Sequence, residues 1–233
     1  MPVAEHLMNR KKRIAIYGGT FDPVHVGHLE VAREVAELFE IDELRFVPAT
    51  IAPHKLTLEV TGAIHRYAML ALATQDDPDF CVSTFELEAP DRRYTIDTLA
   101  HFQAEVGESG DLFFVMGADS WSEITTWRQW ERLLEMVNHI VVTRPGYDIN
   151  LSLVSSAVRA RVLDLRGSAE PSKLIRQAEK RIFITDAVRL EVSATEIRRA
   201  ARARRLERLR ELVPPEVAQY IIKYELYKES NEA

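Results

Sequence analysis

Two histidines, His25 and His28, follow a pair of glycines, Gly18 and Gly19, near the start of the chain. Residues three apart share one face of a helix, so both imidazoles would point the same way if a helix begins here. Glycine accepts positive φ and lets backbone N–H groups come close to a ligand. A helix N-terminus adds unpaired N–H donors and the positive end of the helix dipole. Together these groups predict an anion site, and phosphate is the anion that suits it best.

A strand, a turn and a helix must position these groups. The apolar run from Ile14 to Tyr17 is typical of a buried parallel strand. Asp22-Pro23 indicates a turn, and the spacing of apolar residues predicts a helix from about Gly27 to Glu40. A second strand is predicted from Leu44 to Pro48, which completes a βαβ unit. Ligands of such parallel sheets bind beyond the carboxyl ends of the strands, where the glycines lie.

The rest of the chain continues this alternation. It predicts an α/β protein with a Rossmann-like, doubly wound, mostly parallel sheet of six strands, flanking helices and a small C-terminal helical extension. We expect a flexible leader over 1–12, one main domain over 13–192 with a helix-and-loop insertion at 150–180, and C-terminal helices over 193–233 packed on that domain. Leu151 to Leu165 has the spacing of a helix. Thr95 is predicted to cap one helix, and either Ser193 or Thr195 is predicted to cap another.

Composition excludes several classes of protein. The net charge of -6 argues against a general nucleic-acid binder, which would be basic. Cys81 is the only cysteine, so an internal disulfide and a cysteine zinc site are excluded. No stretch approaches the ~20 apolar residues of a membrane span, and none fits a signal peptide. We therefore expect a cytoplasmic protein without nucleic-acid or membrane partners; the sequence leaves open whether it forms a homo-oligomer.

The stretch from Gly18 to His28 reads Gly-Gly-Thr-Phe-Asp-Pro-Val-His-Val-Gly-His. It matches neither the dinucleotide fingerprint Gly-x-Gly-x-x-Gly nor the P-loop. It resembles the signature of the nucleotidyltransferases that carry the His-x-Gly-His motif, and its Gly-Gly-Thr-Phe-Asp-Pro form is similar to bacterial nicotinate-nucleotide adenylyltransferases. Further motifs similar to that family's follow in the same order as far as Tyr227.

The resemblance implies that most of the ATP contacts are to phosphate. His25 and His28 would stabilise charge on the phosphates, and the nucleotides would lie against the backbone of Gly18, Gly19, Thr20 and Phe21. Two further motifs add cationic and hydroxyl groups.

Lys55, in Pro-His-Lys, would contact phosphate, although the Asn that usually precedes this motif is missing. Ser193, Thr195 and Arg198 match a Ser-Ser-Thr-x-Ile-Arg motif that binds the ATP phosphates, except that Ala194 replaces its second serine.

Two loops at later strand ends complete the nucleotide site that the resemblance implies. Gly117 and Asp119 follow one strand, and the Asp119 carboxylate could accept hydrogen bonds from a ribose. Arg144, in Arg-Pro-Gly-Tyr, follows the next strand and is a candidate anion contact for the mononucleotide substrate.

The resemblance also implies a site for a pyridine mononucleotide. Thr20 and Phe21 would border it, Trp127 would stack on the pyridine ring, and the ring would lie near the helix that begins at Tyr94 and Thr95. A helix N-terminus offers N–H donors to a pyridine carboxylate, which is a physical reason for preferring the acid over the amide.

The resemblance implies one reaction, the transfer of AMP from ATP to the mononucleotide. The mononucleotide phosphate would attack the α-phosphorus of ATP directly, giving deamido-NAD and pyrophosphate, since no Ser-His or Cys-His nucleophile pair is recognisable. The catalytic residues would be His25, His28, Lys55 and Arg198, with Mg²⁺ arriving with ATP. The alternatives are nicotinamide-mononucleotide, pantetheine-phosphate or glycerol-phosphate nucleotidyltransferases, a class I aminoacyl-tRNA synthetase, whose Lys-Met-Ser-Lys-Ser loop is absent, and a non-catalytic nucleotide sensor.

Overall fold

The computed structural model describes residues 10–50, 60–88, 94–143, 148–168, 171–175, 180–186 and 192–228. Its strands are β1 (Lys12–Gly19), β2 (Glu43–Pro48), β3 (Phe80–Val82), β4 (Gly110–Gly117), β5 (Asn138–Val142), β6 (Val162–Asp164) and β7 (Ile182–Thr185). Its α-helices are α2 (Val26–Leu38), α3 (Ala63–Thr74), α4 (Thr95–Val106), α5 (Ala118–Ser122), α6 (Trp130–Met136), α7 (Ser156–Arg159), α8 (Pro171–Ile175), α9 (Ala194–Arg202), α10 (Leu206–Leu212) and α11 (Pro215–Lys223). Short 3-10 turns are η1 (Gly107–Ser109), η2 (Ile124–Thr126) and η3 (Leu151–Leu153).

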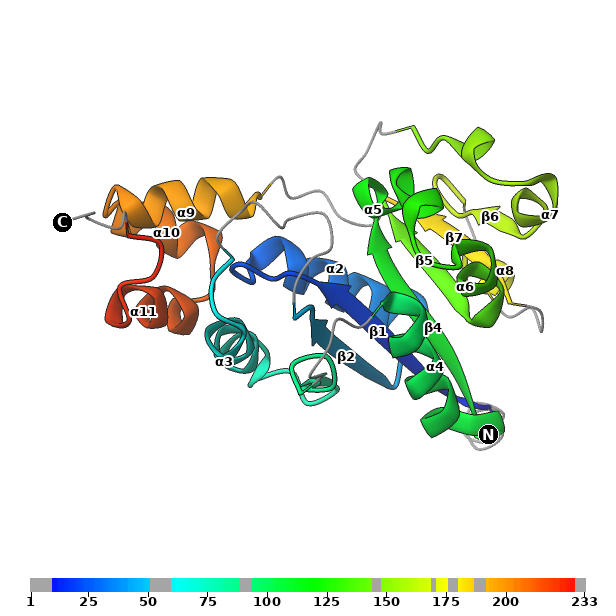
Figure 1. Ribbon diagram of the computed structural model, residues 1–233, viewed down its shortest axis with the longest axis horizontal. Helices are drawn as coiled ribbons and strands as arrows, with labels where there is room; N and C mark the ends of the chain where they lie inside the picture. Colours follow the sequence, from blue (N-terminus) through cyan, green and yellow to red (C-terminus); the bar gives the residue numbers. More distant parts are fainter. Residues whose placement is uncertain are drawn as a thin grey trace.

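The strands of the described ranges form one parallel sheet in the order β3-β2-β1-β4-β5-β7-β6 (Figure 1). From β1 the order runs outward to β2 on one side and to β4 on the other, so the chain changes direction across the sheet beside β1. A switch point of this kind opens a crevice at the carboxyl ends of the two strands. The predicted Rossmann-like α/β class is confirmed.

The sheet has seven strands in the described ranges, one more than the six predicted. The extra strand, β6, lies where the spacing of Leu151 to Leu165 predicted a helix. In that segment the chain makes only η3 and the single turn α7 before β6 pairs with β7. A strand of three residues is too short for its own apolar pattern to reveal it, and its pairing with β7 defines it.

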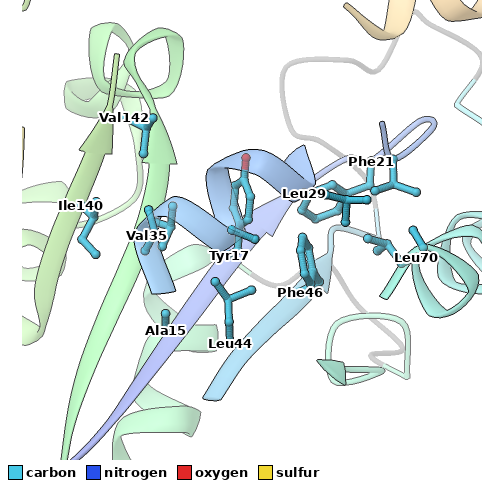
Figure 2. Close-up of a cluster of buried hydrophobic side chains, with 14 of the residues drawn as sticks. Ala15, Tyr17, Phe21, Leu29, Val35, Leu44, Phe46, Leu70, Ile140 and Val142 are labelled. Atoms are coloured by element: carbon cyan, nitrogen blue, oxygen red, sulfur yellow. The ribbon is translucent and has the colours of Figure 1, made fainter. Parts of the chain in front are cut away.

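Strand β1 buries side chains on both faces of the sheet. Ile14 and Ile16 belong to the cluster that includes residues of α4 and α6, whereas Ala15 and Tyr17 belong to the cluster that includes residues of α2. Figure 2 shows the second cluster, to which β1 contributes Ala15 and Tyr17 and α2 contributes Val35. Because successive side chains point to opposite faces, burial of both faces explains why this strand is apolar throughout.

The C-terminal helices gather at the end of the molecule where α3 lies (Figure 1). Helix α11 packs against α3, and α10 packs against both α9 and α11. Arg198 of α9 donates a hydrogen bond to the carbonyl of Asp22, so α9 begins beside the loop that follows β1. Among the helices in the described ranges, none has the length and apolar character to cross a membrane.

One predicted helix cap is confirmed and one is wrong. Ser193 caps α9, since its hydroxyl oxygen accepts a hydrogen bond of 3.2 Å from the N–H of Glu196. Thr95 is not the N-cap of α4 but its first residue, and Tyr94 occupies the N-cap position. The Asp97 carboxylate accepts a hydrogen bond of 3.3 Å from the Tyr94 N–H, which fixes the start of α4 from within its first turn.

A fully buried histidine at the start of β5 predicts acid sensitivity of the fold. His139 has no exposed surface, and its Nδ1 lies 3.1 Å from the Val137 carbonyl, so Nδ1 carries the hydrogen of the neutral ring. Burial lowers the pKa of His139 to about 3. The unfolded chain, with an ordinary histidine pKa of ~6.5, binds this proton first as the pH falls. The contribution of neutral His139 to the free energy of unfolding is therefore complete above pH ~6.5. It is lost progressively as the pH falls toward 3.

We expect the free energy of unfolding to fall by up to about 1.4 kcal/mol per pH unit below pH ~6.5 through this residue. His139→Asn keeps an N–H donor for the Val137 carbonyl but does not titrate, so its unfolding free energy should depend less on pH between 6.5 and 5 in urea titrations. His101→Asn, at an exposed histidine, is the control and should keep the wild-type slope. Equal slopes for all three proteins would contradict the prediction.

Candidate active site

A cleft of about 890 Å³ opens at the carboxyl ends of β1, β4 and β5. Loops and helix starts from distant parts of the chain contribute to its lining. Most of the predicted site residues line it: Gly18, Gly19, Thr20, Phe21, His25, His28, Tyr94, Thr95, Gly117, Asp119, Trp127, Ser193 and Arg198. The fold thus brings together motifs that lie up to 180 positions apart (198 − 18) in the sequence.

The loop after β1 is strained at Phe21, whose φ of 48° lies in the left-handed region. The Phe21 ring is buried and packs edge-on against Tyr17 and His28, with ring centroids 5.5 and 5.0 Å away. Gly18 and Gly19 do not use the positive φ that glycine allows, because both continue strand β1. Gly19 is required for another reason, since a Cβ there would lie 2.9 Å from the Phe21 ring.

His25 and His28 form a stacked pair at the start of α2. His25 is the N-cap residue, and the two ring centroids lie 3.6 Å apart with an interplanar angle of 21°. The backbone N–H of His25 donates a hydrogen bond of 3.3 Å to Nδ1 of His28. Because Nδ1 accepts, a neutral His28 carries its hydrogen on Nε2. That N–H remains as a donor for a ligand in the cleft.

His28 stays neutral in the free protein. Burial, and then the charge of the neighbouring His25, lower the pKa of His28 well below its ordinary 6.5. Gly27 makes the close pairing of the rings feasible, because a Cβ at this position would lie 3.2 Å from Nδ1 of His25. The spacing His-x-Gly-His therefore has a steric reason as well as a chemical one.

Strand β4 ends at Gly117, and Asp119 lies in the first turn of α5 at the edge of the cleft. Oδ1 of Asp119 accepts a hydrogen bond of 2.9 Å from the N–H of Ser120, which orients the carboxylate. Burial, and then the charge of Asp119, raise the pKa of the Tyr17 phenol above its ordinary value. Asp119 therefore makes this side of the cleft electronegative.

Arg198 reaches the cleft from α9. Its Nη1 donates a hydrogen bond of 2.7 Å to the carbonyl of Asp22, and its Nη2 lies 3.3 Å from the Thr195 hydroxyl. Thr195 is exposed and does not line the cleft, so the structure places it as a contact of Arg198. These two bonds fix the guanidinium beside the loop that carries His25.

The start of α4 forms another part of the cleft wall. The guanidinium of Arg128 lies over the Tyr94 ring, 4.7 Å from its centroid, and both residues line the cleft. Trp127 packs edge-on against Phe114, with ring centroids 6.3 Å apart. The indole Nε1 of Trp127 is buried and has no hydrogen-bond partner within the described parts of the chain. This wall combines aromatic faces with a cation.

The sequence of this chain matches the cytidylyltransferase-like family model over residues 16–200. It is 39% identical to a probable nicotinate-nucleotide adenylyltransferase of Thermoanaerobacter sp. (strain X514), over 97% of this chain and 99% of that protein. The chain belongs to the nicotinate-nucleotide adenylyltransferase family. A second relative with the same name, from Corynebacterium jeikeium (strain K411), is 37% identical over 91% of this chain and 99% of its own length.

A solved structure shares the fold of this adenylyltransferase family member. The nicotinic acid mononucleotide adenylyltransferase of Plasmodium falciparum, in complex with NaAD, superimposes with a TM-score of 0.68 at 22% identity, covering 93% of this chain and 97% of that one.

Sequence reasoning missed three residues that shape this adenylyltransferase site. The sequence indicates Asp22 only as a turn residue, although Asp22 is buried and lines the cleft. Arg128 follows Trp127 directly and could have been found from that neighbour. Arg66 has no local signal, but it is 1% exposed and donates hydrogen bonds to the carbonyls of Thr20, Thr50 and Thr61. It thereby ties together the loops after β1 and β2 and the start of α3.

Two predicted site residues, Lys55 and Arg144, lie outside the described residues. No group of three or more histidine, cysteine or acidic side chains in the described ranges could hold a metal ion.

Proposed function

We propose that this adenylyltransferase transfers the AMP part of ATP to nicotinate mononucleotide, giving deamido-NAD and pyrophosphate. The observation that carries the proposal is the stacked His25–His28 pair, with the Nε2–H of His28 left to donate at a helix N-terminus. Such a group suits a phosphate whose charge changes during the reaction. The names of the two curated relatives state the same activity.

The reaction requires no covalent intermediate with the protein. An oxygen of the mononucleotide phosphate attacks the α-phosphorus of ATP. The bond from that phosphorus to the oxygen bridging to the β-phosphate breaks, and pyrophosphate leaves with the bonding electrons. The protein must hold the two reactants in line and stabilise charge on the phosphate oxygens.

The residues of the cleft take the following roles in this proposal. Neutral His28 donates its Nε2–H to the α-phosphate, and His25 supports its orientation. Arg198, with Ser193 at the start of α9 and with Lys55, binds the phosphates that leave as pyrophosphate. Thr195 orients Arg198. The backbone of Gly18, Gly19, Thr20 and Phe21 borders both nucleotides. Gly117 and Asp119 complete the ATP site, and Arg144 is an anion contact for the mononucleotide substrate.

The acid would be selected at the α4 wall. Trp127 stacks on the pyridine ring, and the N–H groups at the start of α4, near Tyr94 and Thr95, donate to its carboxylate. Arg128 adds a positive charge beside the Tyr94 ring. A carboxylate gains from that charge, whereas a neutral amide gains less.

In this proposal, Mg²⁺ enters the site only as an ion bound to ATP. Mg²⁺ typically binds nucleotide phosphates and keeps several waters, and it would neutralise phosphate charge. The proposed transfer has no step that depends on a protein-bound metal.

We expect pyrophosphate release with ATP and magnesium to be about tenfold or more faster, in kcat/KM, with nicotinate mononucleotide than with nicotinamide mononucleotide, because charge-assisted contacts favour the acid. Arg128→Gln should narrow this preference by raising the KM of the acid alone. The matched control is Arg132→Gln, at an exposed arginine on α6 outside the cleft lining. Faster release with nicotinamide mononucleotide would contradict the proposed substrate but would still support the adenylyl transfer. Binding of ATP without any release of pyrophosphate would indicate a sensor.

A further inference from the structure

Asp22 is the meeting point of three distant segments. Its side chain is 6% exposed, and its Oδ1 accepts a hydrogen bond of 2.8 Å from the phenol of Tyr227, 205 positions away. Its Oδ2 accepts a bond of 3.1 Å from the N–H of Thr61, and its carbonyl accepts the bond from Arg198. The residue three positions before His25 is therefore fixed from the start of α3, from α9 and from the C-terminal segment.

The loop needs such contacts because its own backbone does not favour the observed conformation. Phe21, next to Asp22, has a φ of 48°, a left-handed conformation that is strained for a residue other than glycine. Arg66 also holds this loop, because its Nη1 donates a hydrogen bond of 2.7 Å to the Thr20 carbonyl. Strained backbone of this kind persists only where its surroundings over-determine it.

Tyr227 is well placed to hold the loop permanently. Its carbonyl accepts a hydrogen bond of 3.2 Å from Nε of Arg202, so the residue is anchored on α9 at the same time. Burial, and then the charge of Asp22, raise the pKa of the Tyr227 phenol above its ordinary value, so it remains a donor. Tyr227 does not line the cleft.

The phenol has a second consequence for Arg198. A buried carboxylate oxygen that loses its donor attracts a neighbouring cation, because an unpaired buried charge is costly. Arg198 already touches the carbonyl of the same residue. The Tyr227 phenol donates to Oδ1 of Asp22. The Arg198 guanidinium therefore stays bonded to the Asp22 carbonyl, where it can bind an anion in the cleft.

We propose that Tyr227 is a positioning residue for ATP, acting through the Asp22 carboxylate on the loop after β1 and on Arg198. The inference rests on the proposed role of Arg198 as a phosphate contact. Loss of the phenol lets Asp22 draw Arg198 away from the nucleotide.

The test is Tyr227→Phe, which removes one oxygen and keeps the ring. We expect kcat/KM for ATP to fall about tenfold, as for the loss of a hydrogen bond to a charged group, with the KM of nicotinate mononucleotide changed less than about twofold. The matched control is Tyr220→Phe, which removes a phenol that lies 3.0 Å from His65 in the same helical part of the chain. It should leave kcat and the KM values of both substrates unchanged.

A double-mutant cycle with Arg198→Ala separates this inference from the proposed function. If Tyr227 acts through Arg198, adding Tyr227→Phe to Arg198→Ala costs little further activity. A wild-type kcat/KM for ATP in Tyr227→Phe overturns the inference and leaves the proposed function standing. The same holds if Tyr227→Phe and Tyr220→Phe lower kcat/KM equally for both substrates. An Arg198→Ala variant with unchanged kcat/KM for ATP overturns the phosphate role of Arg198 and the inference with it.

Discussion

Replacing His28 by alanine is expected to lower kcat by at least about a hundredfold without unfolding the protein. The substitution removes the Nε2–H that would meet the α-phosphate, and a donor placed in advance at a site of changing charge contributes strongly to catalysis. His28→Asn is the sharper variant, because its amide oxygen can replace Nδ1 as acceptor for the His25 N–H while it offers nothing at the position of Nε2. Both variants should be equally inactive in a pyrophosphate-release assay.

His101→Ala serves as the control for this experiment, since His101 is exposed and stacks on Phe85 outside the cleft lining. The pH profile adds an independent test. Because the pKa of His28 lies well below 6.5, kcat/KM should stay level as the pH falls from 8 to ~6.5 if the neutral ring is the active form. A rise in kcat/KM toward acid pH would mean that the imidazolium acts instead, and near-normal activity of His28→Asn would place the phosphate donor elsewhere.

Replacing Arg66 by methionine is expected to destabilise the protein by about 3 kcal/mol or more. Methionine fills much of the space, but three backbone carbonyls lose their donors, and each unsatisfied buried acceptor costs about 1–3 kcal/mol. Burial lowers the pKa of Arg66, and the charge of Asp22 opposes this effect, so the variant also leaves the buried Asp22 carboxylate without its balancing charge. Urea titration should give a lower midpoint.

Arg33→Met is the matched control for the stability measurement. Arg33 lies on α2 and pairs with Asp77 at 2.8 Å, but its side chain is 56% exposed. Exposed ion pairs contribute about 0–1 kcal/mol, so this variant should unfold close to the wild type. A similar, small effect for both substitutions would mean that the loops after β1 and β2 hold their conformation without Arg66.

Much of the candidate site can be predicted from the sequence, because it depends on residues that are close together in the chain. The apolar run of β1, the pair of histidines at the start of α2 and the Ser193 cap each depend on residues within a few positions of one another. Their spacing was therefore sufficient to predict a strand, an anion site and a helix start. The alternation of strands and helices likewise predicted the fold class, because each element must bury its own apolar face.

The tertiary structure decided which distant residues hold these pieces in place. Strand order, the short β6 and the positive φ at Phe21 depend on neighbours that no local pattern specifies. Arg66 looks like any arginine in a helix, and Tyr227 like any tyrosine near a C-terminus, until the fold puts a carbonyl or a carboxylate within hydrogen-bond distance. A backbone carbonyl has the same chemistry in every residue, so the sequence carries no mark of the one that a buried donor will meet. The sequence by itself determined the chemistry of the site, and only the folded chain determined what holds that chemistry in position.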